Sequence, residues 1–271
     1  MPKTAPNKLY LWRDSVLYLG VSFEPDLHRH NAVQCCIALD GKLMVRSHNM
    51  NNWQSCQAAI IASNVRHSVI TTGSTVCLLY LEKTSDNYRS IMDYYNVDPA
   101  CNSHRPLLIH EPISAKLQSL FDNAIPASLD LSAAEHLKNA CLTYFKARLS
   151  PAQKLDARIS RILVMLHQHP NKIFLIEELC DLVHLSESRL QHLFKAEMGL
   201  PIRKYCLWMR LRHVVKIALH GGSLTAAAHG GGFSDAAHFS RTFKSMFGIT
   251  PSTLFSSENS IESLVFENPI M

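Results

Sequence analysis

The spacing of apolar residues divides the chain into a first part of short strands and a second part of helices. Up to about residue 105, short apolar or β-branched segments alternate with turns, which is typical of a small β-sandwich or barrel. The predicted strands are Val33–Leu39, Lys42–Arg46, Ala58–Ala62, Val69–Thr72 and Val76–Glu82. The pattern therefore predicts an N-terminal β domain over residues 1–105.

Residues 106–153 show apolar positions three or four apart, which predicts two helices. We place them at Ile113–Ala124 and Ser132–Leu149, and Ser132 with Glu135 fits a capping box at the start of the second. This segment is interpreted as a helical connector. Its apolar stripe either packs on the β domain of the same chain or pairs with a second copy.

The region 154–257 is predicted to be entirely helical, and a polar tail at 258–271 is predicted to fray. The predicted helices are Leu155–His169, Ile176–Val183, Glu187–Met198, Ile202–His220, Thr225–His229 and Asp235–Phe247. We therefore expect an α+β protein with a β domain, a helical connector and an all-α domain.

The all-α region contains one motif twice. Phe194-Lys195 followed by Gly199 recurs 49 residues later as Phe243-Lys244 followed by Gly248. In each copy a short helix is followed by a turn, a possible capping serine and a second helix with apolar residues on one face. This is the plan of a helix-turn-helix unit, which places its second helix in the major groove of DNA.

The polar faces of the two second helices carry side chains suited to DNA. Arg241 fits a guanine edge, Gln191 an adenine edge, and small side chains a thymine methyl group. The predicted base-reading residues are Ser188, Gln191, His192, Ala237, His238 and Arg241. The predicted phosphate-binding residues are Ser186, Lys195, Ser234 and Lys244.

Net charge agrees with a polyanionic partner. Residues 154–257 hold 13 Lys and Arg against 7 Asp and Glu, whereas residues 1–153 hold 14 against 12. The helical region therefore carries a charge of +6, although a basic solvated surface alone would look the same.

The stretch Gly232-Phe233-Ser234-Asp235-Ala236-Ala237-His238-Phe239-Ser240-Arg241-Thr242-Phe243-Lys244, followed by Phe247-Gly248-Ile249-Thr250-Pro251, resembles the signature of AraC/XylS-type transcription regulators. The first copy is similar to the other motif of that family. The resemblance implies two helix-turn-helix units joined by a long helix. The chain departs from the family at His184, where the first turn commonly has glycine, and at Ala237, where larger polar readers often occur.

The N-terminal part holds a second pattern, His28-Arg29-His30, then Gln34, then Gly41, which resembles the first cupin motif. His67 stands where the second cupin motif has its histidine. Metal-dependent cupins have an acid at the position of Gln34, so we expect neither a metal ion nor a cofactor here. The residues His28, His30, Gln34 and His67 are instead predicted to line a pocket for a small-molecule effector, or to be hydrogen-bonded residues of the barrel.

The predicted function is therefore a sequence-specific transcription regulator and not an enzyme. Its expected partners are double-stranded DNA, with RNA polymerase, a small-molecule effector and a second copy of the chain as further candidates. A cupin oxygenase or isomerase with a DNA-binding tail, and an architectural DNA binder without a ligand, are the alternatives. Eight scattered cysteines, and the lack of a signal peptide or a membrane span, predict a cytoplasmic protein.

Overall fold

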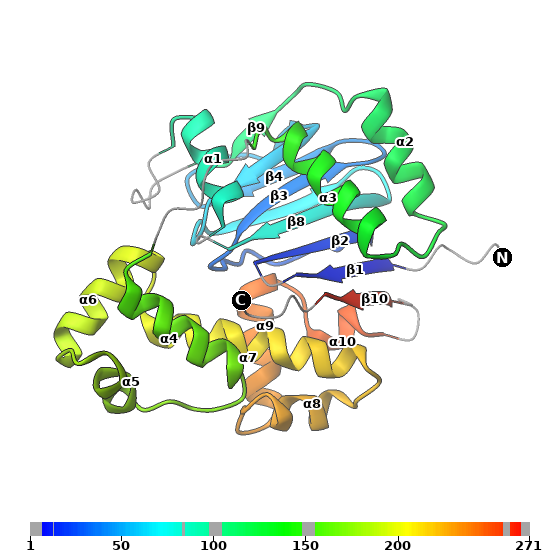
Figure 1. Ribbon diagram of the computed structural model, residues 1–271. Helices are drawn as coiled ribbons and strands as arrows, with labels where there is room; N and C mark the ends of the chain where they lie inside the picture. The colour runs from blue at the N-terminus through cyan, green and yellow to red at the C-terminus, as the bar shows by residue number, and fades with distance from the viewer. Residues whose placement is uncertain are drawn as a thin grey trace. The chain divides into compact units, whose positions relative to one another are not determined.

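The computed structural model describes residues 7–12, 14–82, 85–97, 105–147, 155–256 and 261–266. Its contacts separate two compact units (Figure 1). The first unit comprises the chain up to residue 151 together with residues 244–268, and the second comprises residues 152–243.

Two sheets form the first unit. The larger has the strand order β10-β1-β2-β8-β3-β6-β9, and the smaller has the order β5-β4-β7. Described neighbours pair antiparallel, except for β1 and β10, which are parallel. The strands are β1 Asn7–Leu11, β2 Ser15–Val21, β3 Val33–Ala38, β4 Leu43–Ser47, β5 Gln54–Cys56, β6 Ala58–Ile61, β7 His67–Thr71, β8 Thr75–Leu81, β9 Leu107–Ile109 and β10 Ile261–Val265.

The five strands predicted from the sequence are confirmed to within two residues at each end as β3, β4, β6, β7 and β8. Every residue of β3 is buried, which agrees with its nearly continuous apolar sequence. The hairpin of β1 and β2 was not predicted. Its short apolar stretch is interrupted by charged residues at the turn, and a single sequence does not distinguish such a turn from a loop.

Three helices pack on the larger sheet: α1 (Asp86–Tyr94), α2 (Ala115–Ala124) and α3 (Leu131–Tyr144) (Figure 1). The helix α1 was not predicted. The predicted capping box of Ser132 and Glu135 is wrong, because α3 begins earlier and the side chain of Asp130 accepts the N–H of Ala133. Asp130 caps as well as serine does, and its position one residue before Leu131 places Ser132 inside the helix.

The apolar stripe of the predicted connector packs on its own sheet. Leu117 and Phe121 of α2 and Leu137 and Cys141 of α3 are buried in one core cluster with the strands. Of the two alternatives for this stripe, packing within the chain is therefore the one observed, and these side chains are not exposed to a second copy.

The C-terminal tail contains a strand, so the prediction that it frays is wrong for its described residues. Ile261–Val265 pairs with β1 along its whole length. The Lys8 ammonium, on a side chain only 1% exposed, lies 2.6 Å from a carboxylate oxygen of Glu262 and also donates to the carbonyl of Ala127 at 2.6 Å. Glu262 also contacts the hydroxyl of Ser128. This pairing depends on residues more than 200 positions apart, which local sequence cannot indicate.

The second unit is helical, as predicted. Its helices are α4 Ala157–Gln168, α5 Ile176–Val183, α6 Glu187–Met198, α7 Ile202–Leu219, α8 Leu224–Gly230 and the first part of α9 Ala236–Phe247. After α9, the short helix α10 (Pro251–Leu254) leads toward β10. The helices α4, α5 and α6 share a core to which α7 contributes Ile202, Tyr205 and Met209.

Candidate nucleic-acid interface

The first helix-turn-helix unit consists of α5, a turn and α6. The turn contains His184, which adopts the left-handed conformation (φ 54°, ψ 49°) at the end of α5. Leu185 follows it, packed against the core, and the chain then enters α6. Histidine therefore occupies a position whose backbone favours glycine. The atypical turn noted in the sequence keeps the geometry of the motif.

The helix α6 has one buried face and one exposed face. Leu190, Phe194 and Met198 are at most 1% exposed. The side chains predicted to contact DNA lie on the opposite face, and all are exposed: Ser186, Ser188, Gln191, His192 and Lys195. The Gln191 amide donates to the carboxylate of Glu187 at 2.7 Å, a contact that was not predicted. An adenine edge would have to compete with this carboxylate for the amide.

The second unit of the motif consists of α8, its turn and α9. Gly232 is left-handed (φ 75°), and a Cβ on it would lie 2.8 Å from the carbonyl oxygen of Asn171. Arg210 donates to the carbonyl of Gly232 at 3.1 Å, and its guanidinium lies over the ring of Phe233. This contact holds the second turn. The preceding Gly231 is required as well, because a Cβ there would lie 2.1 Å from a methyl group of Val214 on α7.

The start of α9 is capped by Asp235. Its carboxylate accepts the N–H of His238 at 2.6 Å and the hydroxyl of Ser234 at 3.0 Å. The backbone N–H of His238 and the Ser234 hydroxyl hold the pKa of Asp235 below its usual value. The imidazole of His238 lies 3.2 Å from the same hydroxyl and packs edge-to-face on Phe233. Of the predicted contacts at this end of α9, Ser234 and His238 are therefore engaged locally.

Further along α9, the side chains of Ala237 and Arg241 are exposed, whereas Phe239 and Phe243 are at most 2% exposed. Arg241 therefore presents an exposed guanidinium on the outer face. Lys244, predicted to bind phosphate, lies 3.0 Å from the carboxylate of Asp26, and both residues belong to the first unit. The sequence contains no local signal for this ion pair, because 218 positions separate its members.

The two copies of the motif end in the same way. Gly199 after α6 and Gly248 after α9 are both left-handed, with φ of 71° and 73°. Each donates its N–H to the lysine carbonyl four residues earlier, at 2.8 Å. The glycines matched by the internal repeat are thus equivalent helix ends, where a residue without Cβ is favoured.

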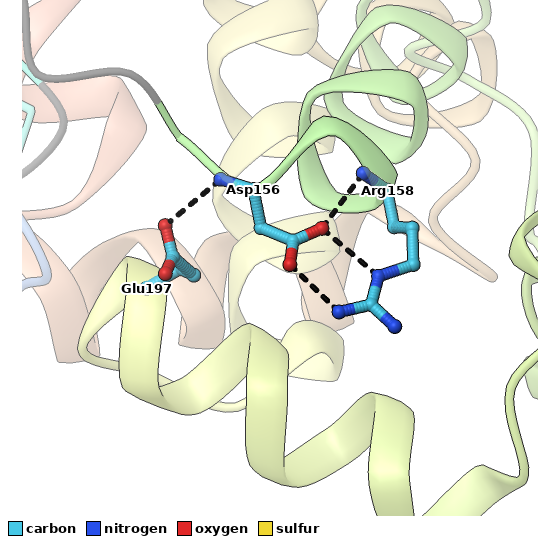
Figure 2. Close-up of polar contacts among 3 residues, drawn as sticks. All are labelled: Asp156, Arg158 and Glu197. Carbon is cyan, nitrogen blue, oxygen red and sulfur yellow. Dashed lines mark hydrogen bonds and ion pairs between the residues drawn. The ribbon is translucent and has the colours of Figure 1, made fainter.

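A polar contact fixes the start of α4 against α6 (Figure 2). The N–H of Asp156 donates to a carboxylate oxygen of Glu197 at 3.3 Å. The Asp156 carboxylate accepts the backbone N–H of Arg158 at 2.8 Å and two guanidinium bonds at 3.0 and 2.7 Å. These bonds lower the pKa of Asp156 to about 2. Arg158 therefore forms an ion pair within the chain.

The histidines singled out in the N-terminal part meet in the first unit. His28 and His67 form an isolated antiparallel bridge, and their ring centroids are 4.4 Å apart. His30 and His67 both approach the side-chain oxygen of Gln34, at 2.9 and 2.8 Å. All four side chains are at least nine-tenths buried. The ring nitrogens lie too close together for an organic molecule to lie among them, so an effector would have to contact the outside of this cluster.

The remaining reactive groups to consider are the cysteine thiols. The seven described cysteines carry free thiols. Burial raises the pKa of Cys206 to about 11, and it raises the pKa of Cys35 and Cys36 well above the usual range, so these thiols are protonated at neutral pH. None of the described helices is both long enough and apolar enough to cross a bilayer.

Comparisons with known proteins agree with the two helix-turn-helix units. Residues 179–257 match the family described as "Helix-turn-helix domain". The chain is 26% identical over 231 residues to a probable transcriptional regulator, LumQ, of Photobacterium leiognathi, covering 83% of this chain and 90% of LumQ.

Solved structures show the same fold over most of the chain. ToxT from Vibrio cholerae has a TM-score of 0.55 at 14% identity, covering 89% of this chain and 97% of ToxT. A structure of ToxT with a bound unsaturated fatty acid gives the same TM-score and identity, covering 89% of this chain and 95% of ToxT. The predicted α+β architecture, a β domain followed by a helix-turn-helix domain, is thus confirmed.

Fold, motif and relatives together define a DNA-binding protein that regulates transcription. Within that class the chain resembles regulators of the AraC type in its second motif, and it has a β-sheet domain at its N-terminus and a helix-turn-helix domain toward its C-terminus.

Proposed function

We propose that this regulator reads two successive major-groove segments, one with α6 and one with α9. The observation that carries the proposal is the repetition of one geometry. Each copy has a left-handed turn, a helix with a buried apolar face and an exposed polar face, and a left-handed glycine at its end. A packed helical bundle without DNA has no need for matching polar faces.

The helix α7 connects the two copies. Its 18 residues correspond to about 27 Å of helix, close to the repeat of about 34 Å between groove segments on one face of B-DNA. We propose that Gln191 and Arg241 read bases, with Ser188, His192, Ala237 and His238 in supporting contacts. Ser186, Lys195, Ser234 and Lys244 would contact phosphates, at helix N-termini and through ammonium groups.

The experiment is a selection of bound sequences from random DNA with the full chain. We expect a site with two blocks of preferred bases about one helical turn apart. Arg241→Ala should cost about 1–3 kcal/mol and relax preference in one block, and Gln191→Ala should relax it in the other. Lys116→Ala, which removes an exposed charge on α2, is the matched control and should change neither block.

An equal loss of affinity by Arg241→Ala on selected and random DNA would remove Arg241 from the base readers. A single block of preferred bases would show that one copy of the motif serves only as scaffold. Lys195→Ala should weaken binding to all sequences alike and flatten the salt dependence by about one charge.

We further propose that the β domain receives a small-molecule signal. The support is the fold shared with ToxT, one structure of which holds an unsaturated fatty acid. His28, His30, Gln34 and His67 would lie at or behind the wall of such a pocket. We also propose that the protein acts in the cytoplasm and contacts RNA polymerase. It would associate with a second copy through surfaces other than the buried stripe. A screen of fatty acids and other small metabolites by thermal shift would test for the effector.

A further inference from the structure

The helix α7 packs against both helix-turn-helix units. Its first half contributes to the core shared with α4, α5 and α6, and Met209 is the last of its residues there. Its second half lies close to α8, since a Cβ on Gly231 would lie 2.1 Å from a methyl group of Val214. Arg210 stands where the first half ends and the second begins. Its side chain is therefore placed to act between the two helix-turn-helix units.

Arg210 connects α7 to the turn that leads into α9. Its guanidinium donates to the carbonyl of Gly232 at 3.1 Å, and its central carbon lies 5.5 Å from the ring centroid of Phe233. The ring of Phe233, which is 3% exposed, packs edge-to-face on Phe239 of α9 at 5.4 Å between centroids. A charged donor strengthens a hydrogen bond, and a planar guanidinium stacks on an aromatic face. One arginine thus joins α7 to α9 through a buried ring.

The same turn also lies against the segment between α4 and α5. A Cβ on Gly232 would lie 2.8 Å from the carbonyl oxygen of Asn171 in that segment, and 3.4 Å from the stem of Arg210. The helices α4 and α5 share their core with α6. The turn before α9 is therefore held between Arg210 and the first helix-turn-helix unit, which restricts changes in the angle between α6 and α9.

Two reading helices that are fixed to one another fit one separation of their DNA segments. One base pair added between the segments rotates the second by about 35° around the DNA axis. When α6 then faces its bases, α9 no longer faces its own. A loosely joined pair of helices would follow this rotation. The stiffness of the junction therefore decides how strictly the protein discriminates between spacings.

We propose that Arg210 is a positioning residue that fixes α9 relative to α6, and thereby determines which spacing between two blocks of bases the protein accepts. This role rests on the reading of two groove segments proposed above. It requires no contact between Arg210 and DNA, because the arginine acts through Gly232 and Phe233.

The test measures the affinity of the full chain for its selected DNA site, and for two versions with one base pair added or removed between the blocks. We expect wild type to bind the altered sites at least about tenfold more weakly. Arg210→Ala should reduce this ratio to about threefold or less, because the turn loses its bond to α7. Arg210→Lys should give an intermediate ratio, since an ammonium supplies the charge but not the planar fork of donors.

Arg203→Ala is the matched control, because it removes the same charge from an exposed position of α7. It should change the affinity for the three DNAs by one common factor and preserve the ratio. A merely structural role of Arg210 would also preserve the ratio, because a smaller folded fraction weakens binding to every DNA alike. Circular dichroism shows which variants are folded. If Arg210→Ala does not fold, Arg210→Lys decides.

Two results would overturn the role of Arg210 and leave the reading of two segments intact. One is a wild-type ratio in folded Arg210→Ala, or in Arg210→Lys where the alanine variant does not fold. The other is a wild-type chain that selects two blocks but binds all three DNAs equally, which would show a flexible junction. A selected site with a single block would instead overturn the reading of two segments, and the role of Arg210 with it.

Discussion

At the residue scale, the two turns of the helix-turn-helix units adopt the same backbone conformation with different residues. His184 and Gly232 stand at corresponding positions, and both are left-handed. A side chain with a Cβ in that conformation costs about 1 kcal/mol or more relative to glycine. The first turn carries this cost on an exposed histidine, whereas the second has no space for a Cβ beside Asn171.

We therefore expect Gly232→Ala to lower the free energy of unfolding by about 1–3 kcal/mol, from the left-handed backbone and the contact with the Asn171 carbonyl. The matched variant His184→Gly should raise it by up to about 1 kcal/mol. Chemical denaturation followed by circular dichroism measures both. A Gly232→Ala protein as stable as wild type would show that the second turn can shift to admit a methyl group.

At the element scale, the strand β10 depends on one buried charge. Lys8 lies in β1, and its ammonium is compensated by Glu262 of β10. Removing one partner of a buried pair leaves a charge without compensation, which is costly. Glu262 is 30% exposed, so water relieves part of that cost. The pairing of β10 with β1 should thus be sensitive to the charge of this one carboxylate.

Glu262→Gln should destabilise the chain by about 1–3 kcal/mol, and exchange of the β1 amide hydrogens should accelerate. The hydrogen bond from Lys8, and then that from Ser128, lowers the pKa of Glu262 below its usual value of 4.5. Its contribution to stability is therefore fully present above pH 4.5 and is lost as the pH falls through the lower folded value. Glu24→Gln, at an exposed carboxylate, is the control and should leave both measurements unchanged.

At the scale of the whole molecule, one residue predicted to contact DNA, Lys244, forms an ion pair within the protein. Lys244 pairs with Asp26 at 3.0 Å, and Asp26 donates its N–H to the carbonyl of Gly248 at 3.0 Å. Both charged side chains are at least half exposed, so the ion pair is worth at most about 1 kcal/mol. A DNA phosphate would compete with Asp26 for the same ammonium.

Asp26→Asn should accordingly raise the affinity for DNA, by up to about fivefold at low salt, because Lys244 no longer has to leave a carboxylate. The effect should shrink at higher ionic strength. In a Lys244→Ala background, Asp26→Asn should leave the affinity unchanged. An equal gain in that background would mean that Asp26 acts by general repulsion of DNA, as any surface carboxylate would.

The sequence by itself determined the helical half of this protein. The period of apolar residues located α5 and α6 at their observed ends, because this signal arises between residues a few positions apart. The recurrence of one motif after 49 residues identified two equivalent units. The spacing of His28 and His30 also marked the histidine cluster.

Tertiary structure decided what depends on distant residues: the parallel pairing of β10 with β1, the packing of α2 and α3 on their own sheet, and the ion pair of Lys244. It also decided the tautomers of the three histidines, since each is set by the backbone carbonyl that the fold places beside Nδ1. Local sequence patterns indicate which side chains could contribute to a function. Only the folded chain determines which of them already have a partner.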